Sequence, residues 1–263
     1  MARARLIAGF LALTALLFSL GPRAQGMEAE GRGSLGEVYV SYAFVSPQIV
    51  RVLEERGDWI LVSTWLGPRW IERNPGPVFF REAIPVHVLA LMQGRSFPAH
   101  TPFSPETLTY LTITHVDFAG ADRIGHMIVA AEIGEEVLEI FREIYESGFP
   151  IYNMQLIDYF DADDYLSMAA NNSSAFNFRY IANTNVISRH GFGMAIDINP
   201  VQNPYVRGDR VLPEAGRAYL DRRDVRPGMI VPGDAVYLAF TSRGWTWGGH
   251  WNSLQDYHHF ERR

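Results

Sequence analysis

The residues best suited to chemistry lie in one stretch, Ser188 to Pro200, with the sequence SRHGFGMAIDINP. His190 is followed by glycines that permit a tight bend, and the chain then alternates as a strand does. The apolar face of this strand consists of Met194, Ile196 and Ile198. Because successive side chains point to opposite faces, Asp197 points away from the predicted core, where the bend could bring it beside His190. We interpret this pair as part of a metal site that needs a further ligand.

Candidates for the missing ligand lie in the C-terminal run Trp247 to Glu261, WGGHWNSLQDYHHFE. A catalytic zinc ion takes imidazole nitrogen and carboxylate oxygen from three residues and keeps one position open. The run contains three histidines, at positions 250, 258 and 259. If residues 258–261 are extended, His258 shares a face with Phe260, whereas His259 shares one with Glu261. Because a metal ligand belongs on the polar face, we assign the third ligand to His259.

Asp256 lies three residues before His259 and could approach the same site from the preceding turn. A hydrolase needs a second carboxylate that does not bind the metal, because a base must take a proton from the attacking water and deliver it to the leaving amine. Asp256 is therefore a candidate for this second carboxylate.

These motifs together resemble a known family. The order His-(six residues)-Asp, then WGG-x-W, then Asp-x-x-His-Phe-Glu is similar to the zinc peptidases of the D-alanyl-D-alanine carboxypeptidase and L-alanyl-D-glutamate peptidase family, which includes phage endolysins and vancomycin-resistance dipeptidases. The resemblance runs from about Leu111 to the C-terminus and includes GFPIYNM, DADDYLSMAANNSSAFNFR and SRHGFGMAIDINPVQNPY. It implies an α+β fold with a central antiparallel sheet, zinc held by His190, Asp197 and His259, and Asp256 as the general base.

The resemblance also implies two substrate contacts. Arg179, at the end of SSAFNFR, falls where the family has an arginine that steadies the substrate or the developing oxyanion, and Ser188 falls where a substrate-contacting hydroxyl is expected. From spacing alone, Arg179 fits a structural salt bridge equally well. The family's substrates are peptidoglycan stem peptides. Carboxypeptidase action on D-Ala-D-Ala and endopeptidase action on L-Ala-D-Glu use the same metal site.

Two positions depart from the family pattern. Position 258 is His where relatives often have Pro, and position 250 is His where they often have an acidic residue. Either histidine could offer the metal an alternative ligand or perturb the base, although His250 also fits an ordinary loop residue.

The N-terminal half of the mature chain has a different pattern. Short apolar runs from Gly36 to Leu91, including IPVHVLAL, are separated by turn signals and predict a small all-β domain over residues 37–91. The piece Arg56 to Ile71 resembles the tryptophan-containing hairpin of bacterial SH3-like domains, which typically hold a secreted enzyme near the cell wall. The alternative is that its tryptophans only fill the core of a small barrel.

Residues 92–107 contain three prolines and predict a linker, which leaves residues 108–263 as the catalytic domain. This domain begins with a strand candidate, LTYLTITHVDF. A helical pattern follows within MIVAAEIGEEVLEIFREIYESG, with Gly148 at its end, and then another strand candidate, FPIYNMQLI. The order of strand, helix and strand predicts an α+β domain. The early polar residues His115, Asp117 and His126 match no ligand spacing, and we interpret them as structural.

The chain begins with a segment typical of export. Residues 1–24 combine early arginines with an apolar run from Leu6 to Leu20, which is too short for a comfortable membrane span, and predict a signal peptide; an uncleaved anchor is the alternative. Residues 25–36 are a polar leader. We expect export to the periplasm, with the cell surface or the medium as alternatives, and no stable membrane span after cleavage.

Composition excludes several other functions. The 263 residues contain no cysteine and no lysine, which excludes a cysteine nucleophile, a lysine Schiff base and a P-loop. The net charge of −6 disfavours nucleic-acid binding. Two histidines and a carboxylate also form the facial triad of non-haem iron oxygenases, but there the first histidine and the acid are usually one residue apart. A non-catalytic wall-binding protein is the second alternative, although every expected ligand is present.

Overall fold

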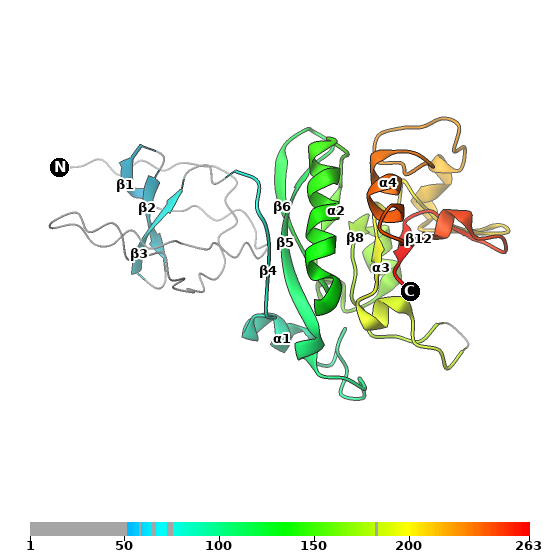
Figure 1. Ribbon diagram of the computed structural model, residues 1–263, viewed down its shortest axis with the longest axis horizontal. Helices are drawn as coiled ribbons and strands as arrows, with labels where there is room; N and C mark the ends of the chain where they lie inside the picture. The colour runs from blue at the N-terminus through cyan, green and yellow to red at the C-terminus, as the bar shows by residue number, and fades with distance from the viewer. Residues whose placement is uncertain (1–51, 58, 65–66, 73–75, 182–183) are drawn as a thin grey trace. The chain divides into compact units, whose positions relative to one another are not determined.

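The computed structural model describes residues 52–57, 59–64, 67–72, 76–181 and 184–263 (Figure 1). The chain divides into two compact units, Met1–Gly76 and Pro77–Arg263. The predicted signal peptide, residues 1–24, and the leader, residues 25–36, lie outside the described residues. Within the described ranges, no helix has both the length and the apolar character that crossing a membrane requires.

The described part of the first unit is a three-stranded antiparallel sheet with the order β1-β2-β3. Its strands are β1 (Val52–Arg56), β2 (Trp59–Thr64) and β3 (Gly67–Glu72). β2 and β3 form a hairpin whose pairing runs from Trp59 opposite Glu72 to Thr64 opposite Gly67. The SH3-like identity of this unit stays a prediction, since residues 37–51 lie outside the described part.

The boundary between the units lies earlier than the sequence predicted, because residues 77–107 belong to the second unit. β4 (Phe79–Glu82) pairs antiparallel with β5 (Leu108–Val116), which binds this segment to the second unit's sheet. The proposed linker, residues 92–107, therefore does not separate two domains: Phe97 and Phe103 within it pack against the buried cluster that includes Leu108.

The run IPVHVLAL forms a helix, and its assignment to the all-β domain is wrong. α1 (Val86–Met92) begins directly after Pro85, where a proline costs no intrahelical hydrogen bond. Val88 and Met92 are buried four residues apart on one face of this helix. A short apolar run is compatible with the period of a strand and with that of a helix, and this run forms a helix.

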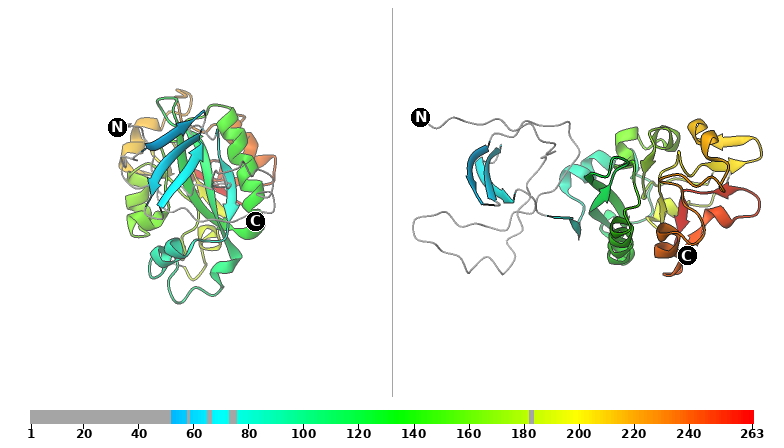
Figure 2. Two further views of the ribbon diagram at one scale, coloured as in Figure 1. Left: turned by 90° about the vertical axis from the view of Figure 1, so that its left-hand side faces the viewer. Right: turned by 90° about the horizontal axis from the view of Figure 1, so that it is seen from above.

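The central sheet of the second unit has the order β4-β5-β6. β5 pairs antiparallel along its whole length with β6 (Asp122–Ala130), so LTYLTITHV is a strand as predicted. The residues MIVA, grouped with the following helix in the sequence, complete β6. α2 (Gly134–Glu146) lies along this sheet in all views (Figures 1 and 2), and its apolar face packs with β5 in one buried cluster. The α+β class predicted for the second domain is confirmed.

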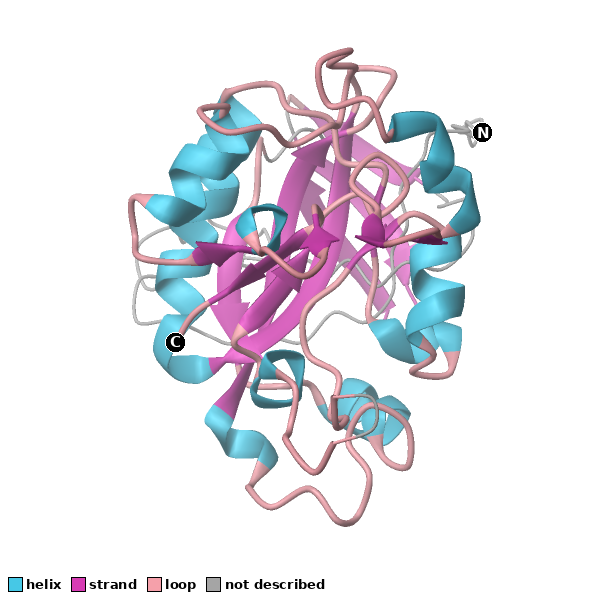
Figure 3. Ribbon diagram, turned by 90° about the vertical axis from the view of Figure 1, so that its right-hand side faces the viewer, coloured by secondary structure: helices cyan, strands magenta, loops and turns pink. Residues whose placement is uncertain are grey.

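Shorter elements form the rest of the second unit, with helical segments on either side of its strands (Figure 3). They are η1 (Pro105–Thr107), η2 (Ala131–Ile133), β7 (Asn153–Met154), η3 (Ile157–Phe160), α3 (Asp164–Ala169), β8 (Asn172–Ser173), η4 (Arg189–Phe192), β9 (Ala195–Asp197), β10 (Tyr205–Arg207), β11 (Arg210–Leu212), η5 (Glu214–Tyr219), α4 (Ala235–Thr241), β12 (Thr246–Trp247), η6 (Gly248–His250), β13 (Gln255–Asp256) and β14 (His259–Glu261). Only two residues of the predicted strand FPIYNMQLI, those of β7, are in a strand.

A second antiparallel sheet, with the order β12-β14-β9, carries two of the three predicted ligands, Asp197 and His259. Its apolar side chains face the core: Ile196 and Phe260 are fully buried, and Phe260 stacks on Phe240 with ring centroids 4.2 Å apart. Because side chains alternate along a strand, burying Ile196 and Phe260 turns their neighbours Asp197 and His259 to the opposite face.

Candidate metal centre

Asp197 and His259 are cross-strand neighbours. β9 and β14 pair antiparallel with His259 opposite Asp197 and Phe260 opposite Ile196. Residues directly opposite each other have Cβ atoms about 5 Å apart on the same face, so the register alone brings the two side chains together. The structure thus places His259, rather than His258, beside Asp197.

His190 reaches the same place from η4, a single helical turn. This turn ends at Gly193, whose φ of 69° lies in the left-handed region. A Cβ at Gly193 would lie 2.5 Å from the backbone nitrogen of Ala130, which donates a hydrogen bond of 2.9 Å to the Gly193 carbonyl. Glycine is therefore required here both by its backbone conformation and by the close approach of β6. This contact fixes the His190 turn to the end of the central sheet.

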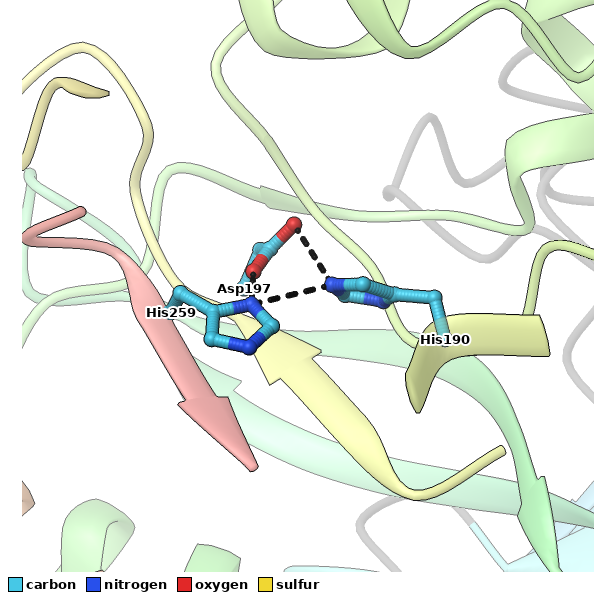
Figure 4. A group of neighbouring side chains, drawn as sticks. All are labelled: His190, Asp197 and His259. Carbon is cyan, nitrogen blue, oxygen red and sulfur yellow. Dashed lines mark hydrogen bonds and ion pairs between the residues drawn. The ribbon is translucent and has the colours of Figure 1, made fainter. Parts of the chain in front are cut away.

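The three side chains form a small triangle of donor atoms (Figure 4). Nε2 of His190 lies 3.1 Å from Nδ1 of His259 and 3.2 Å from Oδ2 of Asp197. Nδ1 of His259 lies 3.0 Å from Oδ1 of Asp197. All three residues are buried, and their donor atoms lie within 4.8 Å of one another, a grouping that could hold a metal ion.

The outer nitrogen of each histidine is held by an acceptor. Nδ1 of His190 donates to the carbonyl oxygen of Ala175 at 2.6 Å, and Nε2 of His259 lies 3.4 Å from Oε2 of Glu261. Because carbonyl and carboxylate oxygens only accept, the outer nitrogens can donate ring protons to them, which would leave the lone pairs of the inner nitrogens available to a metal ion. Such outer-shell partners are typical of metal-binding histidines.

The donor set fits a zinc ion. The inner nitrogens of His190 and His259 lie 3.1 Å apart. Ligand atoms at about 2.0–2.1 Å from a tetrahedral zinc ion are about 3.3 Å apart, close to the separations observed. Two imidazoles and one carboxylate are also a common set for catalytic zinc, so His190, Asp197 and His259 have the chemistry and spacing to hold this ion.

Electrostatics at the triangle favour a cation. Burial by itself lowers the pKa of His259, but the hydrogen bonds to Asp197 and Glu261 outweigh it and raise the pKa to about 10. Burial raises the pKa of Asp197, yet the positive charges of His190 and His258 outweigh it and hold that pKa well below its usual range. The negative potential that raises the pKa of His259 is also what attracts a metal ion to this place.

Asp256 lies on β13, which pairs with β10 so that Asp256 is opposite Tyr205. The WGG motif lets η6 pack directly on this residue: a Cβ at Gly248 would lie 2.7 Å from the carbonyl oxygen of Asp256 and 2.9 Å from its Cβ. No side chain fits into this space without displacing Asp256. The motif that sequence analysis used only as a family marker thus has a steric function.

His258 lies next to Asp256 and outside the triangle. Its Nε2 is 2.8 Å from Oδ1 of Asp256 and 3.9 Å from Oδ2 of Asp197. Burial lowers the pKa of His258, but the carboxylates of Asp256 and Asp197 outweigh it and raise the pKa to about 9. The sequence left open whether His258 offers the metal an alternative ligand or perturbs the base. The structure places His258 beside the predicted base, Asp256.

His250 is exposed and packs its ring against aromatic neighbours. Its ring centroid lies 5.0 Å from that of Trp247 and 5.5 Å from that of Tyr237, both in edge-to-face arrangements. The residue is not part of the metal-competent group. These contacts are those of an ordinary packing residue in a loop.

Arg179 and Ser188 lie at the base of one loop. The backbone nitrogen of Ser188 donates to the carbonyl oxygen of Arg179 at 2.9 Å, two residues before His190. The guanidinium of Arg179 forms an ion pair with Asp164, with Nη2 2.6 Å from Oδ2, while its Nη1 is buried without a hydrogen-bond partner in the described part of the chain. Their substrate-contacting roles stay predictions.

The early polar residues of the second unit are structural in their contacts. Asp117 accepts from Arg123 at 2.7 Å and from two backbone amides of its own turn. The His126 ring stacks on Tyr110, with centroids 5.1 Å apart. Among the described residues, the triangle of His190, Asp197 and His259 is the one group found that could hold a metal.

Sequence reasoning missed the outer partners of the site. The sequence places Glu261 on the same strand face as His259. That shared face is the signal that the Glu261 carboxylate approaches the His259 ring. Neither Ala175, which accepts from His190, nor Asn203, which accepts from His258, carries a recognisable local signal.

Part of the chain matches a known protein family. Residues 182–262 match the sequence model of a family described as D-alanyl-D-alanine carboxypeptidase. The matched segment contains the triangle, Ser188 and Asp256, and it supports the zinc peptidase family that the motifs resemble; Arg179 lies outside it. No curated protein and no solved structure matches the chain.

Proposed function

We propose that this protein is an exported zinc-dependent peptidase that hydrolyses the stem peptides of peptidoglycan. The observation that carries the proposal is the buried triangle of His190, Asp197 and His259, whose inner nitrogens face each other at 3.1 Å while their outer nitrogens are held by acceptors. This arrangement lies within the segment that matches a carboxypeptidase family.

The three residues of the triangle would hold zinc and leave a fourth position open. A bound zinc ion supplies Lewis acidity, which polarises a scissile carbonyl and lowers the pKa of a water from about 15.7 to about 7. The outer acceptors, Ala175 and Glu261, keep both rings in the tautomer that directs a lone pair inward.

Asp256 is the proton acceptor in this proposal. The oxygen of a water molecule attacks the carbonyl carbon of the peptide bond, and the Asp256 carboxylate takes the proton that this water loses. When the carbon–nitrogen bond breaks, the same carboxyl group delivers the proton to the leaving amine. A placed acid/base of this kind typically contributes about 10²- to 10⁴-fold to the rate.

Arg179 and Ser188 are the proposed substrate contacts. Their backbones are joined by a hydrogen bond, Ser188 lies two residues before His190, and Arg179 has a buried Nη1 that no described residue pairs. A guanidinium at this place would stabilise a developing oxyanion or a substrate carboxylate. We propose a periplasmic site of action, with the N-terminal unit holding the enzyme near the cell wall.

Purified protein tests the proposal directly. Incubated with muropeptides, the zinc-loaded protein is expected to shorten stem peptides, and mass spectrometry of the released fragments separates loss of a terminal D-Ala from cleavage between L-Ala and D-Glu. Metal analysis of protein purified without added metal should give stoichiometric zinc. Stoichiometric iron, or zinc-loaded protein that leaves every muropeptide intact, would show the proposal to be wrong.

A further inference from the structure

His258 is fully engaged although the proposed chemistry does not use it. Its side chain is 4% exposed. Nδ1 lies 2.7 Å from the carbonyl oxygen of Asn203, which can only accept, so this nitrogen carries a hydrogen and the plane of the ring is fixed. The other nitrogen, Nε2, lies 2.8 Å from Oδ1 of Asp256 as an ion-pair contact.

Asn203 is a rigid anchor for that ring. It is completely buried, and its side-chain oxygen accepts from the backbone nitrogen of Ile230 at 2.7 Å and from Nη2 of Arg222 at 2.9 Å. Its side-chain nitrogen donates to the carbonyl oxygen of Gly228 at 2.8 Å. Because these hydrogen bonds come from several different residues, they hold the side chain of Asn203 in one orientation.

The backbone on either side of His258 is held as well. The guanidinium of Arg222 lies over the ring of Tyr257, 4.5 Å from its centroid, and also donates to the carbonyl oxygen of Ile230 at 2.6 Å. The carbonyl oxygen of His258 accepts from the backbone nitrogen of Ile198 at 3.0 Å. His258 is therefore fixed at its ring and at its main chain.

The carboxylate of Asp256 has weaker support of its own. Its main chain is placed by the pairing with Tyr205 and by the close contact of Gly248. Within the described ranges, however, its Oδ1 is buried and receives no hydrogen bond. The 2.8 Å ion-pair contact with His258 is thus what restrains this oxygen.

We propose that His258 is a positioning residue for Asp256, which transmits the rigidity of the Asn203 anchor to the carboxylate of the proposed base. This inference rests on the proposed function. It applies to the side chain at position 258 of this chain and not to a proline, which has no ring nitrogen with a hydrogen to share. A base must lie within hydrogen-bond reach of its proton, and a displacement of about 1 Å can cost about 10²-fold in rate.

Two amide substitutions at position 258 test whether His258 positions the Asp256 carboxylate or only supports the fold. In His258→Gln the amide nitrogen can take the place of Nε2 and donate to Asp256. In His258→Asn the amide nitrogen takes the place of Nδ1 and keeps the bond to Asn203, but nothing reaches Asp256. We expect His258→Gln to lose less of the wild-type kcat than His258→Asn, because it keeps the contact with Asp256 although it gives up the bond to Asn203. His258→Asn is expected to lose on the order of 10²-fold in kcat with KM unchanged.

Zinc content, thermal unfolding and crystal structures of the zinc-loaded variants complete the experiment. Both variants should bind stoichiometric zinc, and the carboxylate of Asp256 should move in His258→Asn but not in His258→Gln. His250→Asn is the matched control, because the same exchange on an exposed ring should leave kcat unchanged.

Three outcomes would overturn the inference: wild-type kcat in His258→Asn, equal losses in the two variants, or loss of zinc from either one. If the wild-type protein cleaves no muropeptide, the proposed function fails. The crystallographic position of the Asp256 carboxylate in the two variants still decides whether His258 positions it.

Discussion

Buried histidines occur in two regions of the second unit. His115 and His126 lie in the β5–β6 sheet, where burial lowers their pKa values to about 4 and about 3. His258 and His259 lie in and beside the short strand β14, where the same penalty from burial is outweighed and the pKa values rise to about 9 and about 10. The difference comes from the carboxylates of Asp197, Asp256 and Glu261. Burial alone therefore does not indicate chemistry, whereas burial beside carboxylates does.

The largest effect is expected on zinc binding, when the carboxylate that contacts the site histidines is removed. Asp197→Ala should abolish zinc binding, with a loss of affinity well beyond the ~10- to 100-fold typical of an outer partner, and should abolish hydrolysis with it. Metal analysis after dialysis and the muropeptide assay measure both. His126→Phe should keep full zinc occupancy, and a loss of zinc from this control would contradict the division into two regions.

Removing the proposed base should stop turnover without removing the metal. Asp256→Ala is expected to lower kcat by about 10²- to 10⁴-fold at unchanged zinc content, because the residue lies outside the donor triangle. Steady-state kinetics with zinc measured on the same sample test this. Parallel loss of zinc and activity would instead make Asp256 a ligand.

A methyl group at Gly248 should displace Asp256 without changing any charge. Since a Cβ there would lie 2.7 Å from the Asp256 carbonyl oxygen, Gly248→Ala should reduce kcat by up to about 10²-fold while zinc stays bound. Zinc content and thermal unfolding of the same sample are the controls. Wild-type kcat in Gly248→Ala would show that the WGG contact does not position the base.

Weakening the outer partner of His259 should have a smaller effect. Glu261→Gln keeps an oxygen that can accept from Nε2 of His259 but removes the charge, so zinc affinity should fall by about 10-fold, at the low end of the range for such partners. Competition with a zinc chelator measures the change. Unaltered affinity would mean that the 3.4 Å contact does not support the ligand.

The smallest effect is expected on the free energy of unfolding and concerns His126 in the β5–β6 sheet. His126 is neutral in the folded protein above a pKa of about 3, while the unfolded chain binds a proton below about pH 6.5, so the free energy of unfolding falls as the pH drops between these values. At pH 5 this cost is about 2 kcal/mol. Urea unfolding at pH 7 and pH 5 should show a loss smaller by this amount in His126→Phe. An unchanged loss would mean that another group carries the acid sensitivity.

Local alternation was enough to predict much of the site. The two-residue period of β9 and β14 indicated which faces Asp197 and His259 would take, because a strand has only two. The α2 face and the β5 strand were predictable for the same kind of reason, and Gly148 follows α2 with a φ of 72° as a helix-ending glycine does.

The failures concern contacts that no local period encodes. The pairing of β4 with β5 joins segments about 30 residues apart and moved the boundary between the units from residue 91 to residue 76. The bond between His258 and Asn203 spans 55 positions in the chain. Such contacts depend on how the whole unit closes, so neither the linker nor the anchor of His258 could be read from its own neighbourhood.

The position of β14 between β12 and β9 bears on how mutation could change this protein. His258 and His259 are adjacent, so a slip of one residue in the pairing with β9 would exchange an imidazole beside the base for one in the ligand triangle. Phe260 prevents the slip, because its ring is fully buried and stacks on Phe240 at 4.2 Å. A single buried phenylalanine thus determines which of two adjacent histidines enters the ligand triangle.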